Sequence, residues 1–115
     1  MSARGIVVVI REDPERSSRP AEALRIAVGL RTGEETLEVV LLGAGARALA
    51  HDASAFEDAE VLETHREALA RAGQAFLVEE TALAAHPAAE LFHVEPLDAA
   101  GLARVLVGAA RHILF

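Results

Sequence analysis

Six residues near the amino end of this chain constrain its fold most. Gly5 to Ile10 reads G-I-V-V-V-I, and a continuous apolar run rich in β-branched residues is typical of a strand that is covered on both faces. Such strands belong to parallel sheets that carry helices on both sides. We therefore predict that residues 5–10 form the central strand of an α/β sheet.

The rest of the 115-residue chain alternates between helical and strand patterns. Longer helices are predicted from Pro20 to Arg31, over residues 62–72 and from Asp98 to Ala110. Short helices are predicted over 47–50 and 79–86, and further strands over 37–42, 75–78, 91–94 and 112–115. This order predicts a single domain, residues 1–115, with a three-layer α/β/α architecture and a mainly parallel sheet of about five strands.

Local signals place several helix ends. Ser17 or Ser18 can cap the first long helix, and Pro20 suits its first turn. Asp98 is a good N-cap for the last helix, and Gly73 suits the stop of the helix before it.

Composition excludes several classes of function. The net charge is -7, and the 11 basic residues, all Arg, are scattered between acidic ones, so a nucleic-acid partner is not expected. No apolar run approaches the roughly 20 residues that span a bilayer, and we expect a cytoplasmic protein without a membrane partner. The chain has no cysteine, which excludes disulfides, thiolate metal sites and persulfide chemistry on this polypeptide.

Candidate site residues follow the predicted strands. Ligands of open α/β sheets bind at the carboxyl ends of strands, and these ends carry Arg11, Glu12, Gly43, Gly45, Glu79, Glu80 and Glu95. Glu79, Glu80 and Glu95 could meet in one pocket, where mutual repulsion would raise a pKa and create a general acid or a cation site. The plainer alternative is that Glu80 starts a helix while Glu79 is solvated or paired with Arg11.

Two further patterns have structural explanations that we favour. Arg11 with Ser17 and Ser18, beside a helix start, would suit a small anion, but an ordinary capped loop explains them as well. Residues 43–48, G-A-G-A-R-A, match the G-x-G-x-x-A dinucleotide turn. They follow the second strand, where a tight turn is the better interpretation. We expect no cofactor, and the five histidines lack the spacing of a metal site.

Three segments resemble the DsrE/DsrF-like family, which includes the TusD, TusC and TusB subunits of bacterial sulfur relays. The helix A-E-A-L-R-I-A-V-G-L, Ala21 to Leu30, is similar to the family's first helix. The strand and turn V-V-L-L-G-A-G-A, Val39 to Ala46, resembles its glycine-ended strand. The ending A-R-H-I-L-F, Ala110 to Phe115, is much like its terminal strand. The resemblance covers nearly the whole chain and implies a DsrE-like fold.

In sulfur-carrying members of the family a cysteine follows the third strand. That position falls here in V-E-E-T, residues 78–81, with Glu79 as the nearest match. A carboxylate cannot carry sulfur, because persulfide transfer needs a sulfur nucleophile.

The resemblance therefore implies a non-sulfur-carrying, structural or binding subunit. It implies assembly as a homo-oligomer, a trimer or hexamer, or as a hetero-oligomer with DsrE-like relatives. We expect no sulfurtransferase activity. The alternative is an enzyme or sensor that binds a small anionic or nucleotide-like ligand at the strand ends.

Overall fold

The apolar run at the amino end forms a fully covered strand. In the computed structural model, which describes residues 5–115, β1 (Gly5–Ile10) is buried at all six residues. It pairs in parallel with β2 (Thr36–Leu41) on one side and with β5 (Arg111–Leu114) on the other. The two longest strands of the sheet therefore lie side by side.

The sheet is completed by β3 (Phe76–Glu79) and β4 (Val94–Leu97), and all its strand pairs are parallel. The strand order is β4-β3-β2-β1-β5. The predicted class, a three-layer α/β/α fold with a parallel sheet, is confirmed. The prediction that residues 5–10 form the central strand is wrong, because β2 lies in the middle. An apolar run indicates that both faces of a strand are covered by other parts of the protein, and any strand in the interior of a sheet can have this property.

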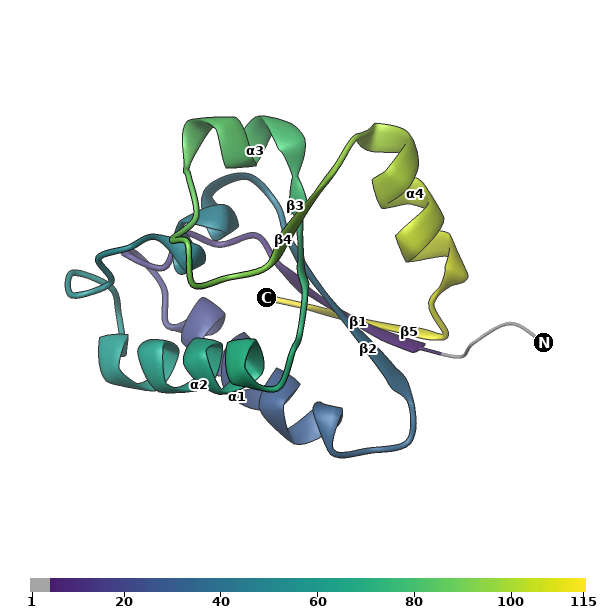
Figure 1. The fold of residues 1–115 in the computed structure, drawn as a ribbon, viewed down its shortest axis with the longest axis horizontal. Helices are drawn as coiled ribbons and strands as arrows, with labels where there is room; N and C mark the ends of the chain where they lie inside the picture. The colour runs from purple at the N-terminus through teal and green to yellow at the C-terminus, as the bar shows by residue number, and fades with distance from the viewer. Residues whose placement is uncertain (1–4) are drawn as a thin grey trace.

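The two faces of the sheet are covered unequally. One face carries α1 (Arg19–Arg31), the 3-10 segment η1 (Gly43–Leu49), α2 (Ala59–Arg71) and α3 (Glu80–Ala85), whereas α4 (Ala99–Gly108) packs on the other. Figure 1 shows α4 standing apart from the remaining helices. Within residues 5–115, none of these helices combines the length and the apolar character needed to cross a membrane.

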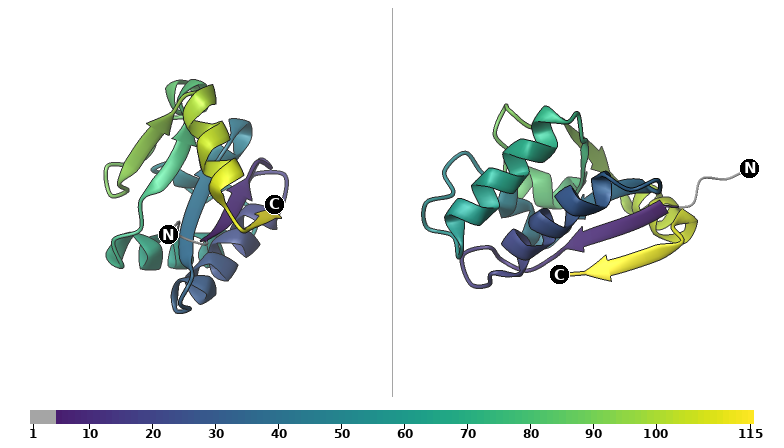
Figure 2. Two further views of the ribbon diagram at one scale, coloured as in Figure 1. Left: turned by 90° about the vertical axis from the view of Figure 1, so that its right-hand side faces the viewer. Right: turned by 90° about the horizontal axis from the view of Figure 1, so that it is seen from below.

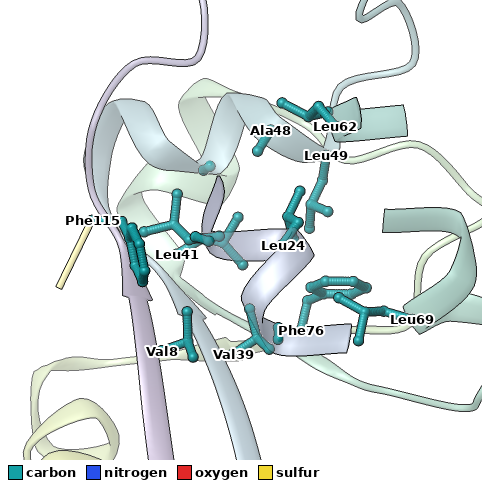
Figure 3. Close-up of a cluster of buried hydrophobic side chains, with 14 of the residues drawn as sticks. Val8, Leu24, Val39, Leu41, Ala48, Leu49, Leu62, Leu69, Phe76 and Phe115 are labelled. Carbon is teal, nitrogen blue, oxygen red and sulfur yellow. The ribbon is translucent and has the colours of Figure 1, made fainter. Parts of the chain in front are cut away.

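The main core lies under the larger helical layer. Val39 and Phe76 of the sheet face Leu24 of α1 and Leu69 of α2 in one buried cluster (Figure 3). The rings of Phe76 and Phe92 pack edge to face with centroids 5.6 Å apart, an arrangement that aromatic quadrupoles favour. A smaller cluster under α4 contains Val7, Val9, Val40 and Leu77.

Most helix ends follow local sequence signals. Pro20 lies in the first turn of α1, and the Asp98 carboxylate accepts a 2.7 Å hydrogen bond from the Gly101 N–H at the start of α4. Gly73 has φ 85° just after α2. The helix α4 ends at Gly108, before the predicted Ala110, because the Ala110 N–H already donates to the Gly5 carbonyl in the sheet (2.8 Å).

The predicted fourth strand, residues 91–94, is misplaced. The strand β4 starts at Val94, while Leu91 is exposed and Phe92 is buried in the main core. The actual strand contains Glu95 and Pro96, which break an apolar pattern but are tolerated at a sheet edge, where one row of backbone groups has no neighbouring strand. The other predicted strands are offset by one residue at most, and η1 includes the glycine turn that we placed before it.

Candidate functional site

The carboxyl ends of β1, β2 and β3 bring most of the predicted site residues to one edge of the sheet. Arg11 and Glu12 follow β1, and Gly43 and Gly45 lie in η1 after β2. Glu79 ends β3 and Glu80 opens α3. Glu95 does not join them, because it lies within β4 opposite Leu77. The predicted convergence of three carboxylates at the strand ends is therefore wrong for Glu95.

Glu79 makes a specific contact across two neighbouring strand ends. Its Oε1 accepts a 3.0 Å hydrogen bond from the Gly43 N–H. Gly43 has φ +50°, a left-handed conformation that suits glycine, and it opens η1 directly after Leu42. The carboxylate thus satisfies one of the backbone N–H groups that a helical segment leaves unpaired at its start. Glu79 is neither simply solvated nor bonded to Arg11, the two structural alternatives considered from the sequence.

A small acidic pocket opens beside Glu79. It measures about 280 Å³ and lies between the ends of β3 and β4, with Glu79, Glu80, Thr81, Leu97, Asp98, Ala99 and Leu102 as its lining. Three of these residues are acidic, and no arginine or histidine is among them. Arg11 follows β1, and β2 separates that strand from β3. The electrostatics of this pocket favour a cationic group and oppose an anion.

The loop after β1 is fastened to the neighbouring edge of the sheet. The Arg11 and Glu12 N–H groups both donate to the Phe115 carbonyl (2.9 and 3.3 Å). The Glu12 carboxylate lies 3.4 Å from the Arg19 guanidinium, and the Ser17 Oγ accepts from the Arg19 N–H (3.0 Å). Ser18 precedes α1 but makes no side-chain cap. The Ser17 hydroxyl and the Glu12 carboxylate therefore hold the loop in place. This matches the ordinary structural loop that we considered as the alternative to an anion site.

Gly45 is required by close packing. A Cβ atom built on it would lie 2.2 Å from the Ile10 carbonyl oxygen and 3.0 Å from the Arg11 Cα. Glycine here lets η1 cross the end of β1 at backbone distance. The segment that follows is a 3-10 helix after the second strand, whereas a dinucleotide fingerprint opens an α-helix after the first. The geometry of G-A-G-A-R-A is thus that of a tight turn.

Ion pairs fasten η1 to the loop after β1. Arg47 donates to Asp13 and to Glu15, each at 2.8 Å, and its guanidinium lies 5.5 Å from the Phe56 ring centroid. Because both carboxylates belong to the loop that leads to α1, these contacts join two segments at the carboxyl end of the sheet.

Sequence reasoning did not single out the buried Arg66. Its Nη1 donates to the carbonyls of Ala48 (2.9 Å) and Ala50 (2.7 Å), and its guanidinium lies 5.0 Å from the Phe92 ring centroid. The Nε atom is buried without a hydrogen-bond partner. Burial lowers the pKa of Arg66, and the nearby charges of Glu63 and Glu67 oppose this shift. The signal available in the sequence was the position of Arg66 four residues after Leu62, which places both side chains on the same face of a helix.

A second pair of carboxylates lies away from the strand ends, on the α4 side of the sheet. Burial raises the pKa of Glu38 above its usual 4.5, and repulsion from Glu95 adds to the shift. Glu95 itself lies 3.2 Å from the His93 ring. No group of three or more His, Cys, Asp or Glu side chains able to hold a metal ion occurs among residues 5–115.

Comparison with known proteins finds the fold in a solved structure. The crystal structure of the ychN protein from E. coli superposes with a TM-score of 0.79 at 21% sequence identity, over 97% of this chain and 99% of that one. No protein-family model matches the chain, and no curated protein matches it. At this identity the likeness establishes the α/β fold, and the chemistry must be argued from the residues themselves.

Proposed function

We propose that this chain is a DsrE-like protein that does not carry sulfur and acts as a structural or binding subunit of an oligomer. The observation that carries the proposal is at the end of β3. There, the position nearest to the family's sulfur-carrying cysteine holds Glu79, whose carboxylate is hydrogen-bonded to the Gly43 N–H. The fold shared with the ychN protein and the sequence resemblance support the family assignment.

Glu79 has a role in the turn that a sulfur carrier would not need. A carrier must be free to attack and to hold a sulfur atom, whereas Glu79 Oε1 lies 3.0 Å from a backbone N–H. The chain has no cysteine elsewhere to replace it. In a sulfur relay such a subunit would build the complex and leave sulfur transfer to a cysteine-containing relative.

The alternative, an enzyme or sensor for a small anionic or nucleotide-like ligand, has less support. The pocket beside Glu79 is lined by Glu79, Glu80 and Asp98, which repel phosphate and sulfur oxyanions. A binding subunit would instead use these carboxylates to receive a cationic group, such as an arginine side chain of a partner subunit.

The proposal is tested by the assembly state and by ligand-induced stabilisation. Light scattering at micromolar concentration should find the chain as an oligomer, such as a trimer or hexamer, or in a mixed complex with a cysteine-containing DsrE-like relative. Nucleotides and sulfur oxyanions should leave the melting temperature unchanged, because a ligand stabilises only a native state that binds it. The proposal fails if the chain is a monomer that does not bind the relative and is stabilised by one of these anions. The loss of that stabilisation in Arg11→Ala would then support the alternative, an anion-binding site.

A further inference from the structure

An apolar patch is left open where α4 meets the edge strand β5. Leu106 and Val107 of α4, with His112 and Leu114 of β5, line a shallow groove of about 510 Å³. We call these four residues the β5–α4 patch. Val107 is 84% exposed and Leu114 is 49% exposed, and large apolar side chains in this position are costly to leave in water.

The backbone of β5 is also open on its outer side. The strand pairs with β1 and forms the last strand of the sheet (Figure 2). The Phe115 N–H and C=O both bond toward β1, so by alternation those of Leu114 and His112 face away from it. The opposite edge strand, β4, contains Pro96 and Glu95, which discourage pairing with another strand. The strand β5 contains no proline, and its one charged residue, Arg111, is ion-paired with Glu35 of its own chain.

Charge indicates which surface can receive a second copy of this chain. Each copy carries a net charge of -7, so the repulsion between two copies is smaller where their contact surfaces contain no carboxylates. Exposed Val61 lies in a pocket with Asp58 and Glu60. Exposed Leu91 lies in one with Glu63, Glu67 and Glu90. The β5–α4 patch has no carboxylate in its lining.

We propose that two copies pair through antiparallel β5 strands about a two-fold axis perpendicular to the sheet. This inference rests on the proposed self-association and specifies its surface. The register places Ile113 opposite Ile113 of the second copy and His112 opposite Leu114. It brings both β5–α4 patches to the same side of the joined sheet, and it places no two like charges opposite each other on the strands.

Hydrogen bonding is compatible with this register. The outward-facing backbone groups of His112 then meet those of Leu114 in the second copy, which is the bonded pair of an antiparallel ladder. The Leu114 carbonyl already accepts from Arg19 of its own chain (2.6 Å). Pairing therefore requires the half-exposed Arg19 side chain to share that oxygen or to turn away. A two-fold contact builds even-numbered assemblies, so of the two expected sizes it fits a hexamer and not a simple trimer.

Matched substitutions of exposed apolar residues test the surface. Leu114→Glu and, separately, Val107→Glu should weaken dimerisation by about tenfold or more, because each places a carboxylate inside the apolar contact. Leu91→Glu is the control, since Leu91 is more exposed than Leu114 but lies on an acidic surface, and it should leave assembly unchanged. Analytical ultracentrifugation gives the dissociation constants, and circular dichroism verifies that each variant is folded.

A single introduced cysteine tests the register. Ile113→Cys should yield a covalent dimer on mild oxidation, because residues in a non-hydrogen-bonded antiparallel pair have Cα atoms about 4.5 Å apart, within disulfide reach. The chain has no other cysteine to react, and Leu91→Cys should stay monomeric on a denaturing gel. An assembled wild type that tolerates Leu114→Glu and Val107→Glu, or an assembled Ile113→Cys that does not cross-link, overturns the β5 pairing and leaves the proposed function standing. A wild type that is monomeric on its own overturns the β5 pairing, and one that also fails to bind a cysteine-containing relative overturns the proposed function as well.

Discussion

Replacing Gly45 by alanine should damage this fold more than the same change at Gly43 or Gly29. The added Cβ would lie 2.2 Å from the Ile10 carbonyl oxygen and 2.6 Å from the Ile10 carbonyl carbon. Both are backbone atoms of a strand buried at every residue, so no side chain can rotate to make room. Either η1 must lift from the sheet or the end of β1 must move.

The size of the effect can be set against two other glycines. Overpacking of this kind costs about 3 kcal/mol, which lowers the melting temperature by roughly 12 °C in a domain of this size. A Cβ on Gly43 meets nothing within 4 Å, but φ is +50°, so alanine there should cost about 1 kcal/mol of backbone strain. Gly29 lies in α1 with open space around it, and alanine should stabilise the helix by about 0.5 kcal/mol.

Urea unfolding followed by circular dichroism measures all three variants, because the chain has no Trp or Tyr for fluorescence. The expected order of stability is Gly29→Ala above wild type, then Gly43→Ala, then Gly45→Ala. A Gly45→Ala variant as stable as Gly43→Ala would refute the packing explanation. It would also reopen the question of whether the glycines of this turn are placed for a ligand.

Two further changes test local contacts. Asp98→Ala should lower the free energy of unfolding by about 1 kcal/mol, because it removes the acceptor for the Gly101 N–H at the start of α4. Thermal melting measures this loss, and Asp52→Ala, which removes an acceptor for the Ser54 N–H in an exposed loop (2.9 Å), should cost less. Glu38→Gln should stabilise the protein at pH 7 but not at pH 4. The pKa of Glu38 is raised in the folded state, so the stability it contributes is complete below its usual 4.5 and is lost as the pH rises through the folded pKa. Equal stabilisation at both pH values would contradict this assignment.

Local signals were sufficient for much of the fold because their causes are local. The β-branched run of β1, Pro20 in the first turn of α1 and the Asp98 cap act within a few residues. The position of β4 could not be predicted in this way. Phe92 looks like part of a strand, but its ring fills the core beside Phe76 and under the Arg66 guanidinium. These partners are far away in sequence, so the apolar pattern alone placed the strand too early.

The same limit explains why the central strand was misidentified. The central strand, β2, begins with exposed Thr36 and also contains half-buried Glu38, and both residues line a small pocket beside α4. It therefore looks less buried in sequence than β1. For the site, Gly43 and Glu79 were both predicted as residues at strand carboxyl ends, but their proximity comes from the pairing of β2 with β3, which the sequence did not specify. Their hydrogen bond depends on a side-chain direction, which no sequence pattern specifies.

One end of the sheet carries an acidic pocket and the other an apolar patch, so the proposed assembly and the proposed binding would use different surfaces. The acidic pocket lies between the ends of β3 and β4, whereas the apolar patch lies on β5. In the order β4-β3-β2-β1-β5, three strand spacings of about 4.8 Å, or about 14 Å, separate β3 from β5. Pairing through β5 would place the two acidic pockets at the outer ends of the joined sheet, where both stay open to a cationic group. Substitutions at Leu114 should therefore change assembly without changing the Glu79 contact.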